Sequence, residues 1–214
     1  MLKGAGRGKT TLVMDTPNLP NNSEQMWSSP MMINIKHNSG LSDLTTGGRG
    51  AILQCDPLYR CWCAVCDDVG APVHTIFLSA CGKTFNQEKA KQLAGEFENI
   101  VLVCGHYEGI DQRFIDECVD EEISLGDFVL TGGELPAMMI TDAVSRLVPG
   151  VLGDEVCFTD ESHWDGLLEY PQYSRPDEWH GLRVPEVLLS GNHAMVDRWR
   201  KKQAILRTMR CRPD

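Results

Sequence analysis

The residues best suited to hold a small molecule fall within one stretch, 101–136. An apolar run, Ile100–Cys104, predicts a buried strand, and a glycine and the polar segment HYEG follow it. A second short strand is predicted at Asp127–Leu130, ended by Gly132–Gly133. Glycine lets a backbone approach a ligand closely or adopt a positive φ angle. Two such strand ends predict a ligand site built from backbone N–H and C=O groups, although a pair of tight turns in an ordinary α/β domain is the alternative.

Strands and helices alternate around this stretch. A strand is predicted at Val73–Ser79, and a turn at Ala80–Gly82 ends it. Helices are predicted at Glu88–Phe97 and Glu134–Leu147, of which the later one is amphipathic. Alternation of strands with helices predicts an α/β domain with a mostly parallel sheet.

Composition places the chain among ordinary globular proteins. It has 214 residues, of which 42% are hydrophobic and 23% are charged. No apolar run approaches the ~20 residues that span a bilayer, and no signal-peptide region follows Met1. The cytoplasm is therefore the expected location, with no membrane partner. Nine cysteines, an odd number without the spacing of a small secreted domain, indicate reduced thiols.

Positive charge gathers near the C-terminus, although the chain carries a net charge of −10. A helix is predicted at Ala194–Met209, and the positive residues from Ala194 onward are Arg198, Arg200, Lys201, Lys202, Arg207, Arg210 and Arg212. A basic tail on an acidic body suits a protein that handles a cofactor in one part and binds RNA with the other. A solvated helix face is the alternative interpretation.

Two further motifs suggest other chemistry and are set aside. Gly4–Thr10 resembles a phosphate-binding loop, but that loop needs a glycine where Lys3 stands, and no strand precedes it. Cys61–Cys66 supplies three thiols, with Cys55 as a distant fourth, whereas structural zinc sites usually use two separated pairs. Neither nucleoside triphosphate binding nor a metal site is predicted.

Five motifs in a fixed order carry a family resemblance. They are CGHYEGIDQR at 104–113, ISLGDFVLTGGELPA at 123–137, VSRLVPGVLG at 144–153, GLLEYPQYSRP at 166–176 and LLSGNHA at 188–194. Together they closely resemble the bacterial tRNA (guanine-N1)-methyltransferase family, TrmD. The resemblance is nearly continuous from about Val73 to the C-terminus, looser over 33–68, and absent before that.

This resemblance implies a fold of the SPOUT class. Such a fold is an α/β domain with a mostly parallel sheet and a C-terminal trefoil knot, here followed by a small, truncated α-helical domain. The expected division is a poorly matched, disordered N-terminus at 1–30, a cofactor-binding domain at 31–153, a flexible linker at 154–165 and a partial helical tRNA-binding domain at 166–214. Within the first segment, Thr11–Asp15 is the one candidate for a strand of the family's sheet.

The resemblance also implies a function. The family uses S-adenosylmethionine to methylate N1 of the guanine just 3′ of the anticodon, at tRNA position 37. Its members are homodimers with the site built across the interface, and some need magnesium, which this sequence neither supports nor excludes. The same activity is expected here. The alternative is a catalytically weak or inactive RNA-binding homologue, because the first strand is missing, the glycine loop at 46–51 is altered and the C-terminal domain is short.

Site residues follow from the motif match. The resemblance implies cofactor contacts at Leu78, Ser79, Gly105, Tyr107, Leu125, Gly126, Asp127, Phe128, Val129, Leu130, Gly132, Gly133 and Pro136. These positions cluster in the turns that follow the predicted strands.

Four further residues are implied in the chemistry. Glu161 falls where relatives carry the aspartate assigned as the base for the N1 proton, with Asp160 as the neighbouring alternative. Arg146 matches the family's essential arginine and is expected to stabilise negative charge at guanine O6, while Glu108 is expected to position the guanine. From the residues alone, Arg146 would instead pair with Asp142 on a helix surface, and the two carboxylates would be solvated linker charges.

Overall fold

The computed structural model describes residues 9–16, 32–36, 41–42, 52–106, 108–152 and 161–213, the first three ranges as backbone only. The chain divides into two compact units, Met1–Leu152 and Gly153–Asp214. Among the described residues, the first unit holds a parallel sheet with helices on both faces, and the second holds a short hairpin and helices.

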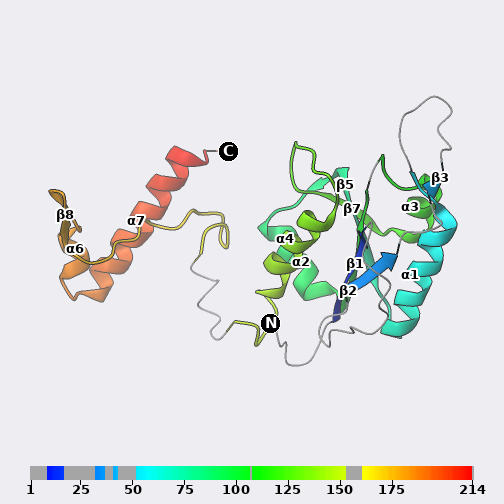
Figure 1. Cartoon of the computed structure of the whole chain (residues 1–214). Helices are drawn as coiled ribbons and strands as arrows, with labels where there is room; N and C mark the ends of the chain where they lie inside the picture. The colour runs from blue at the N-terminus through cyan, green and yellow to red at the C-terminus, as the bar shows by residue number, and fades with distance from the viewer. Residues whose placement is uncertain are drawn as a thin grey trace. The chain divides into compact units, whose positions relative to one another are not determined.

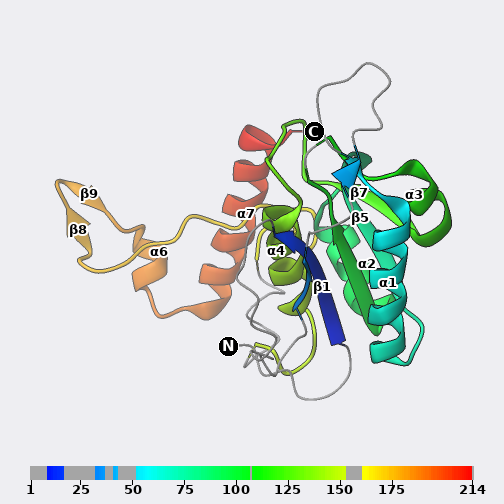
Figure 2. The same ribbon diagram turned by 45° about the vertical axis from the view of Figure 1, so that its right-hand side comes forward.

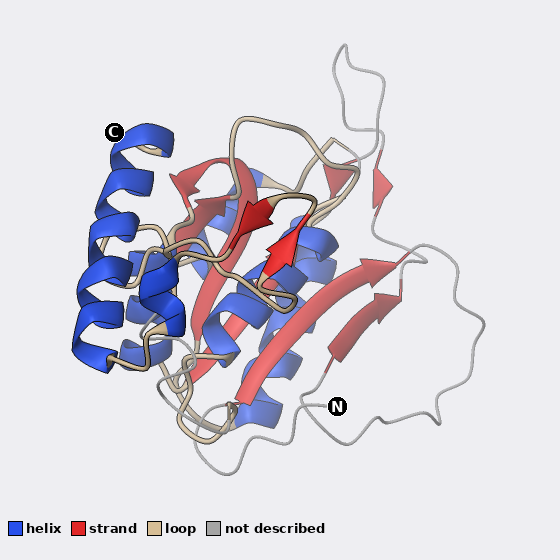
Figure 3. Cartoon of the chain, turned by 90° about the vertical axis from the view of Figure 1, so that its left-hand side faces the viewer, coloured by secondary structure: helices blue, strands red, loops and turns tan. Residues whose placement is uncertain are grey.

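A five-stranded sheet forms the centre of the first unit, in the order β2-β1-β6-β5-β7, and all its neighbouring strands are parallel (Figure 1; Figure 3). Its strands are β1 (Lys9–Thr16), β2 (Met32–Lys36), β5 (His74–Thr84), β6 (Asn99–Cys104) and β7 (Glu121–Ser124). The predicted α/β fold with a parallel sheet is confirmed. A separate two-stranded antiparallel sheet pairs β3 (Leu41–Ser42) with β4 (Ile52–Leu53).

Helices cover both faces of the five-stranded sheet. Helices α2 (Gln87–Glu96) and α4 (Glu134–Ser145) cover one face, and α1 (Cys55–Val69) and α3 (Gln112–Cys118) cover the other (Figure 1; Figure 2). The expected helices at 88–97 and 134–147 correspond to α2 and α4. A sheet buried on both faces needs strands that are apolar throughout, as β6 is.

Strand β6 supplies side chains to two apolar cores in turn. Ile100, Leu102 and Cys104 pack with the core under α2 and α4. Val101 and Val103 pack with the core under α1 and α3. This alternation is the two-residue period of a strand, and the run is apolar throughout because both faces are covered. Strand β6 ends at Cys104, so the turn that begins at Gly105 starts between the two helical layers.

Three expectations about strands need correction. Lys9–Thr16, within the segment expected to be disordered, is strand β1 and includes Thr11–Asp15. The rest of 1–30 lies outside the described residues. Asp127–Leu130 is not a strand, because its apolar side chains face outward in a loop, and the strand of this region is β7. Strand β5 does not end at Ser79 but continues to Thr84, with a register shift between Leu78 and Lys83.

The second unit contains a hairpin and a long basic helix. Strands β8 (Glu178–Trp179) and β9 (Leu182–Arg183) pair antiparallel, and α6 (Glu186–Leu189) and α7 (His193–Cys211) follow. The expected helix at 194–209 is confirmed by α7. The side chain of Asn192 caps this helix by accepting a hydrogen bond from the Met195 N–H. None of the described helices is long and apolar enough to cross a membrane.

The segment before the hairpin lies against α7 without forming a helix or strand of its own. The Leu168 N–H donates to Thr208 Oγ1 at 2.8 Å, and Arg207 donates to the Glu169 carbonyl at 3.2 Å. The guanidinium carbon of Arg200 lies 4.9 Å from the centre of the Tyr170 ring, within cation–π range. These contacts hold the segment 168–170 against helix α7 within the second unit.

Candidate active site

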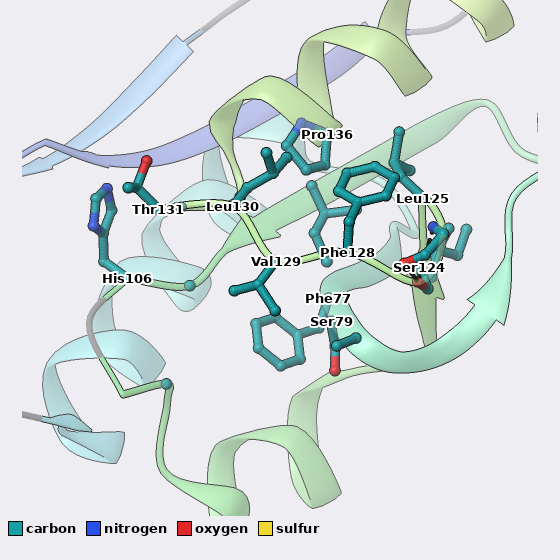
Figure 4. A pocket seen from close by; sticks show the side chains of 18 of the residues that line it. Phe77, Ser79, His106, Ser124, Leu125, Phe128, Val129, Leu130, Thr131 and Pro136 are labelled. Carbon is teal, nitrogen blue, oxygen red and sulfur yellow. Dashed lines mark hydrogen bonds between the residues drawn. The ribbon is translucent and has the colours of Figure 1, made fainter.

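A pocket of about 290 Å³ opens at the carboxyl ends of β6 and β7, beside residues 77–80 of β5 (Figure 4). Three segments line it: the middle of β5, the turn that follows β6, and the end of β7 with the loop that joins it to α4. Ligands of open parallel sheets generally bind at the carboxyl ends of the strands, because loops there diverge and leave a crevice. The pocket is therefore the leading candidate for a binding site in the first unit.

Most of the residues predicted to contact a cofactor line this pocket. They are Leu78, Ser79, Gly105, Leu125, Gly126, Phe128, Val129, Leu130, Gly132, Gly133 and Pro136. Asp127 is exposed and is not part of the lining, and Tyr107 lies outside the described residues. The structure thus brings together residues that are more than 50 positions apart in sequence. Their role as cofactor contacts remains a prediction.

Gly133 sits directly against the end of β6. A Cβ atom added to it would lie 2.7 Å from Cys104 Cα and 3.2 Å from the Gly105 nitrogen. The Gly133 N–H donates to the Gly105 carbonyl at 3.1 Å. Only glycine allows this approach of two backbones, so the loop before α4 is seated on the turn after β6.

Ser124 fixes the other end of the same loop. Its hydroxyl donates to the Gly126 carbonyl and accepts from the Gly126 N–H, both at 3.2 Å. Gly126 has a φ angle of +142°, which L side chains rarely adopt. Beyond it, the residues Phe128 and Val129 are 55% and 90% exposed at the pocket. The loop therefore presents apolar groups at the pocket from a rigid base.

The turn after β6 is held by β4 and by α3. The Leu53 N–H donates to the Gly109 carbonyl and the Asp111 N–H donates to the Leu53 carbonyl, both at 3.0 Å. Asp111 also caps α3, and the hydrogen bond from the Arg113 side chain lowers the pKa of its carboxyl group. This anchored turn carries Glu108, which is one of the residues that line the pocket.

His106 and Glu134 form a contact that sequence reasoning missed. His106 Nε2 lies 2.7 Å from Glu134 Oε1, and His106 lines the pocket. Neither was predicted as a site residue. A signal for His106 was present in its position directly after a buried strand, within a polar turn, but its partner is 28 residues away in sequence. Phe77, Ile123, Ser124 and Thr131 also line the pocket without having been predicted.

The four residues implied in the chemistry are distributed over the two units. Glu108 lines the pocket. Arg146 ends α4 in the first unit, with its N–H bonded to the Asp142 carbonyl at 3.2 Å. Glu161 belongs to the second unit, where its carbonyl accepts from the Trp164 N–H, and Asp160 lies outside the described residues.

Cys104 is buried directly before Gly105 of the pocket lining and is no nucleophile. Burial, followed by the negative charge of Glu134, raises the pKa of its thiol to about 12. A thiol with that pKa stays protonated at neutral pH, and the thiolate is the reactive form. The pocket lining therefore offers backbone groups, apolar side chains, His106 and Glu108, and no covalent catalysis by this cysteine.

Comparison with known proteins identifies the family. Residues 31–214 match the family model described as tRNA (Guanine-1)-methyltransferase TrmD. The chain belongs to this family. It is 53% identical over 168 residues to the tRNA (guanine-N(1)-)-methyltransferase of Ruminiclostridium cellulolyticum, covering 78% of this chain and 72% of that protein. The Alkaliphilus metalliredigens protein of the same name is 55% identical over 170 residues, 78% of this chain and 68% of its own length.

A third relative extends the match. The Staphylococcus epidermidis protein of the same name is 49% identical over 181 residues, 84% of this chain and 72% of that protein. The resemblance inferred from five motifs is thus confirmed. The TrmD motifs CGHYEG and LGDFVLTGGELP supply two of the three walls of the pocket.

Proposed function

We propose that this chain transfers a methyl group from S-adenosylmethionine to N1 of a guanine in tRNA, the guanine just 3′ of the anticodon. The observation that carries the proposal is the convergence of two TrmD motifs on one pocket, in a chain that matches the family model over 31–214. The relatives named above carry tRNA (guanine-N(1)-)-methyltransferase as their name.

The pocket suits S-adenosylmethionine. Backbone at Gly105, Gly132 and Gly133 approaches so closely that an added Cβ at any of them would meet neighbouring atoms. Such glycine turns expose N–H and C=O groups that can hydrogen-bond a nucleoside or an amino acid. The apolar side chains of Phe128 and Leu130 at the pocket can cover an adenine ring. When bound, the cofactor supplies a methyl group attached to a positively charged sulfonium sulfur. After transfer, that sulfur is part of a neutral thioether, the leaving group.

The remaining chemistry falls to charged side chains. Guanine N1 carries a weakly acidic proton, which a carboxylate can remove as the methyl group arrives, and we assign this role to Glu161, with Asp160 as the alternative. Negative charge that develops on guanine O6 needs a cation, and Arg146 is assigned to it. Glu108, in the turn after β6, is assigned to holding the guanine edge because it lines the pocket.

The finer fold and domain plan is also a proposal. Membership of the family and the parallel sheet support a SPOUT fold with a trefoil knot around the cofactor, in a domain that extends to residue 153 and begins with β1 rather than at residue 31. A linker at 154–165 would join it to a tRNA-binding domain at 166–214. The six Lys and Arg residues of α7, opposed there by Asp197 alone, support RNA binding by that domain. Since tRNA is the substrate, we place the enzyme in the cytoplasm.

A homodimer is proposed on the basis of helix α4. Its Leu135, Met138 and Met139 side chains are 58%, 57% and 57% exposed, while Ala137 and Ile140 face the core. An apolar helix face left open to water favours association with a second copy. This proposal agrees with the homodimers implied by the family resemblance.

Magnesium is not assigned a site. Within the part of the chain that the structure describes, no group of three or more His, Cys, Asp and Glu side chains is arranged to hold a metal ion. No step of the proposed reaction uses one.

The decisive experiment is methyl transfer to an unmodified tRNA transcript with a radiolabelled methyl donor. We expect incorporation that disappears when the guanine 3′ of the anticodon is replaced by adenine, because adenine has no N1 proton to exchange for a methyl group. RNA binding without incorporation would favour the alternative, a catalytically inactive RNA-binding homologue. Equal incorporation into both transcripts would contradict the assigned target base.

A further inference from the structure

The contact between His106 and Glu134 joins two walls of the pocket. The two side chains come from different TrmD motifs, and Nε2 and Oε1 lie 2.7 Å apart. Their side chains are only 20% and 21% exposed. A carboxylate has no proton to donate, so the ring N–H of His106 is the donor. Such charge-assisted hydrogen bonds are about twice as strong as neutral ones.

The backbones of the same two segments also pair beside this contact, and we call this pairing of residues 105–106 with 132–133 the backbone seam. His106 and Gly132 form an antiparallel bridge, and the Gly133 N–H donates to the Gly105 carbonyl at 3.1 Å. The pair also covers Gly132, because a Cβ there would meet the Glu134 carboxylate and lie 2.8 Å from His106 Nε2. Figure 4 shows His106 at one end of the pocket, with Ser124 and Leu125 at the other.

The position of Glu134 explains why the contact needs a donor. Glu134 is the first residue of α4, where helix N–H groups favour negative charge, and it faces His106 across the seam. The preceding residue, Gly133, packs against Cys104 of the apolar core, so Glu134 begins its helix beside that core. A carboxylate beside a core requires a hydrogen-bond donor, since leaving it unpaired is costly.

We propose that His106 is a positioning residue for the methyl transfer. Its hydrogen bond to Glu134 holds the turn after β6 and the loop before α4 at the spacing that the bound cofactor requires. The inference rests on the proposed function, because it concerns the same pocket. His106 acts through Glu134 and the backbone seam rather than by removing a proton from the guanine.

The chain provides a matched control at the amino ends of two strands, away from the pocket. His74 Nε2 lies 2.8 Å from Glu121 Oε1, and these side chains are 15% and 22% exposed. His74 begins β5 and Glu121 begins β7, whereas the pocket lies at the carboxyl ends of the strands. This pair has the same chemistry and similar burial but lines no part of the pocket. Its loss should affect folding stability alone.

A double-mutant cycle on cofactor affinity tests the proposal. S-adenosylmethionine affinity is measured by calorimetry for the wild type, His106→Ala, Glu134→Ala and the double variant. Each single change is expected to weaken binding about tenfold, as for the loss of one charge-assisted hydrogen bond. The double variant should bind no more weakly than either single one, because both changes break the same link. His106→Gln, which keeps an N–H near the Nε2 position, should recover most of the affinity.

Two readouts separate positioning from a general structural role. At saturating cofactor, His106→Ala should keep kcat within about threefold of the wild type while the KM for cofactor rises about tenfold. His74→Ala should lower the thermal midpoint and leave cofactor affinity within about twofold, since its pair lies away from the pocket. If His106→Ala lowers the midpoint with unchanged affinity, the pair is structural and the proposal is overturned.

Other outcomes also overturn it. Weaker binding by His106→Ala but not by Glu134→Ala would make His106 a direct cofactor contact. Effects that multiply in the double variant would mean that the two side chains act separately. The proposed function is checked independently with the wild-type protein. If the wild type binds cofactor but methylates no transcript, the proposed function is overturned, although the double-mutant cycle on cofactor affinity can still be measured. If the wild type binds no cofactor, both the proposed function and the positioning role of His106 are overturned.

Discussion

The N–H of Gly133 donates to the carbonyl of Gly105 at 3.1 Å, and no side chain fits between the two backbones. A Cβ on Gly133 would lie 2.7 Å from Cys104 Cα. Cys104 belongs to a buried strand and cannot move aside. The loop before α4 must therefore be the part that shifts when Gly133 is enlarged, and that loop lines the pocket.

Gly133→Val should abolish cofactor binding while leaving the fold mostly intact. Gly133→Ala should weaken binding by about tenfold to 100-fold, because overpacking of this kind displaces a segment at a cost of a few kcal/mol. Calorimetry measures the affinity and circular dichroism the fold. Gly95→Ala is the matched control: Gly95 lies in α2, where an added Cβ meets nothing within 4 Å. That change should raise stability by about 0.4–1 kcal/mol without altering affinity. Normal binding by a folded Gly133→Val protein would show that this seam does not shape the cofactor site.

Periodicity and turn residues were enough to predict several elements. The apolar run of β6 and the helices α2, α4 and α7 were expected within a few residues of their observed ends, because each is either fully buried or amphipathic. Much of the pocket lining could also be predicted from the sequence. Glycines after strand ends indicate close backbone approach, whichever ligand is bound.

Other features depend on partners that are distant in sequence. Strand β7, with the sequence EEIS, is too short and polar to be recognised alone and is defined by its pairing with β5. Asp127–Leu130 has the composition of a strand, yet Val129 is 90% exposed because the loop turns outward at the pocket. The contact between His106 and Glu134 crosses from one motif to another and exists only after β6 and α4 are packed together.

The His74–Glu121 pair should make stability depend on pH. Burial raises the pKa of Glu121, but hydrogen bonds from His74 and Lys89 outweigh it, so the pKa in the folded chain lies below the ordinary 4.5. A carboxyl with a lowered folded pKa stabilises the fold above its unfolded pKa, and this contribution is lost as the pH falls through the folded value. Thermal midpoints of wild type and Glu121→Gln should therefore differ most above the unfolded carboxyl pKa of about 4.3 and converge as the pH falls through the lower folded pKa. Lys89→Met removes a hydrogen bond to Glu121, so in that background the change in thermal midpoint caused by Glu121→Gln should be smaller. A difference that stays constant from about pH 3 to 7 would contradict this account.

Helix α4 should carry the dimer contact. Met138→Glu combined with Met139→Glu places charges on a face that is more than half exposed in the single chain. We expect light scattering to change from a dimer to the 23.8 kDa chain, with loss of methyl transfer. An obligate interface should bury more than about 2,000 Å² in total, so two charges at its centre are enough to prevent it. Tyr59→Glu, at an exposed position on α1 over the other face of the sheet, should leave the dimer intact. A wild type that is monomeric at micromolar concentration and fully active would refute the dimer.

Helix α7 should supply affinity for RNA through its charge. Lys201 and Lys202 are both exposed. Changing both to Glu should weaken tRNA binding and make the salt dependence shallower by about one in log–log slope for each lysine that contacts phosphate. Cofactor affinity should not change, because the pocket belongs to the other unit. Changing both to Arg keeps the charge and should keep the binding. Unaltered tRNA affinity in the Glu variant would move the RNA contact elsewhere.

The carboxylate that removes the guanine proton should be Glu161. Glu161→Gln is expected to slow single-turnover methylation by about 100-fold or more, the usual scale for loss of a general base. Cofactor affinity should hardly change, because the base acts in the transition state rather than in binding the cofactor. Asp160→Asn provides the matched comparison, since the two carboxylates are adjacent. If Asp160→Asn loses the rate and Glu161→Gln keeps it, the mechanism stands with the residues exchanged. If both variants keep near-normal rates, a carboxylate in this segment is not the base, and the proton must leave by another route.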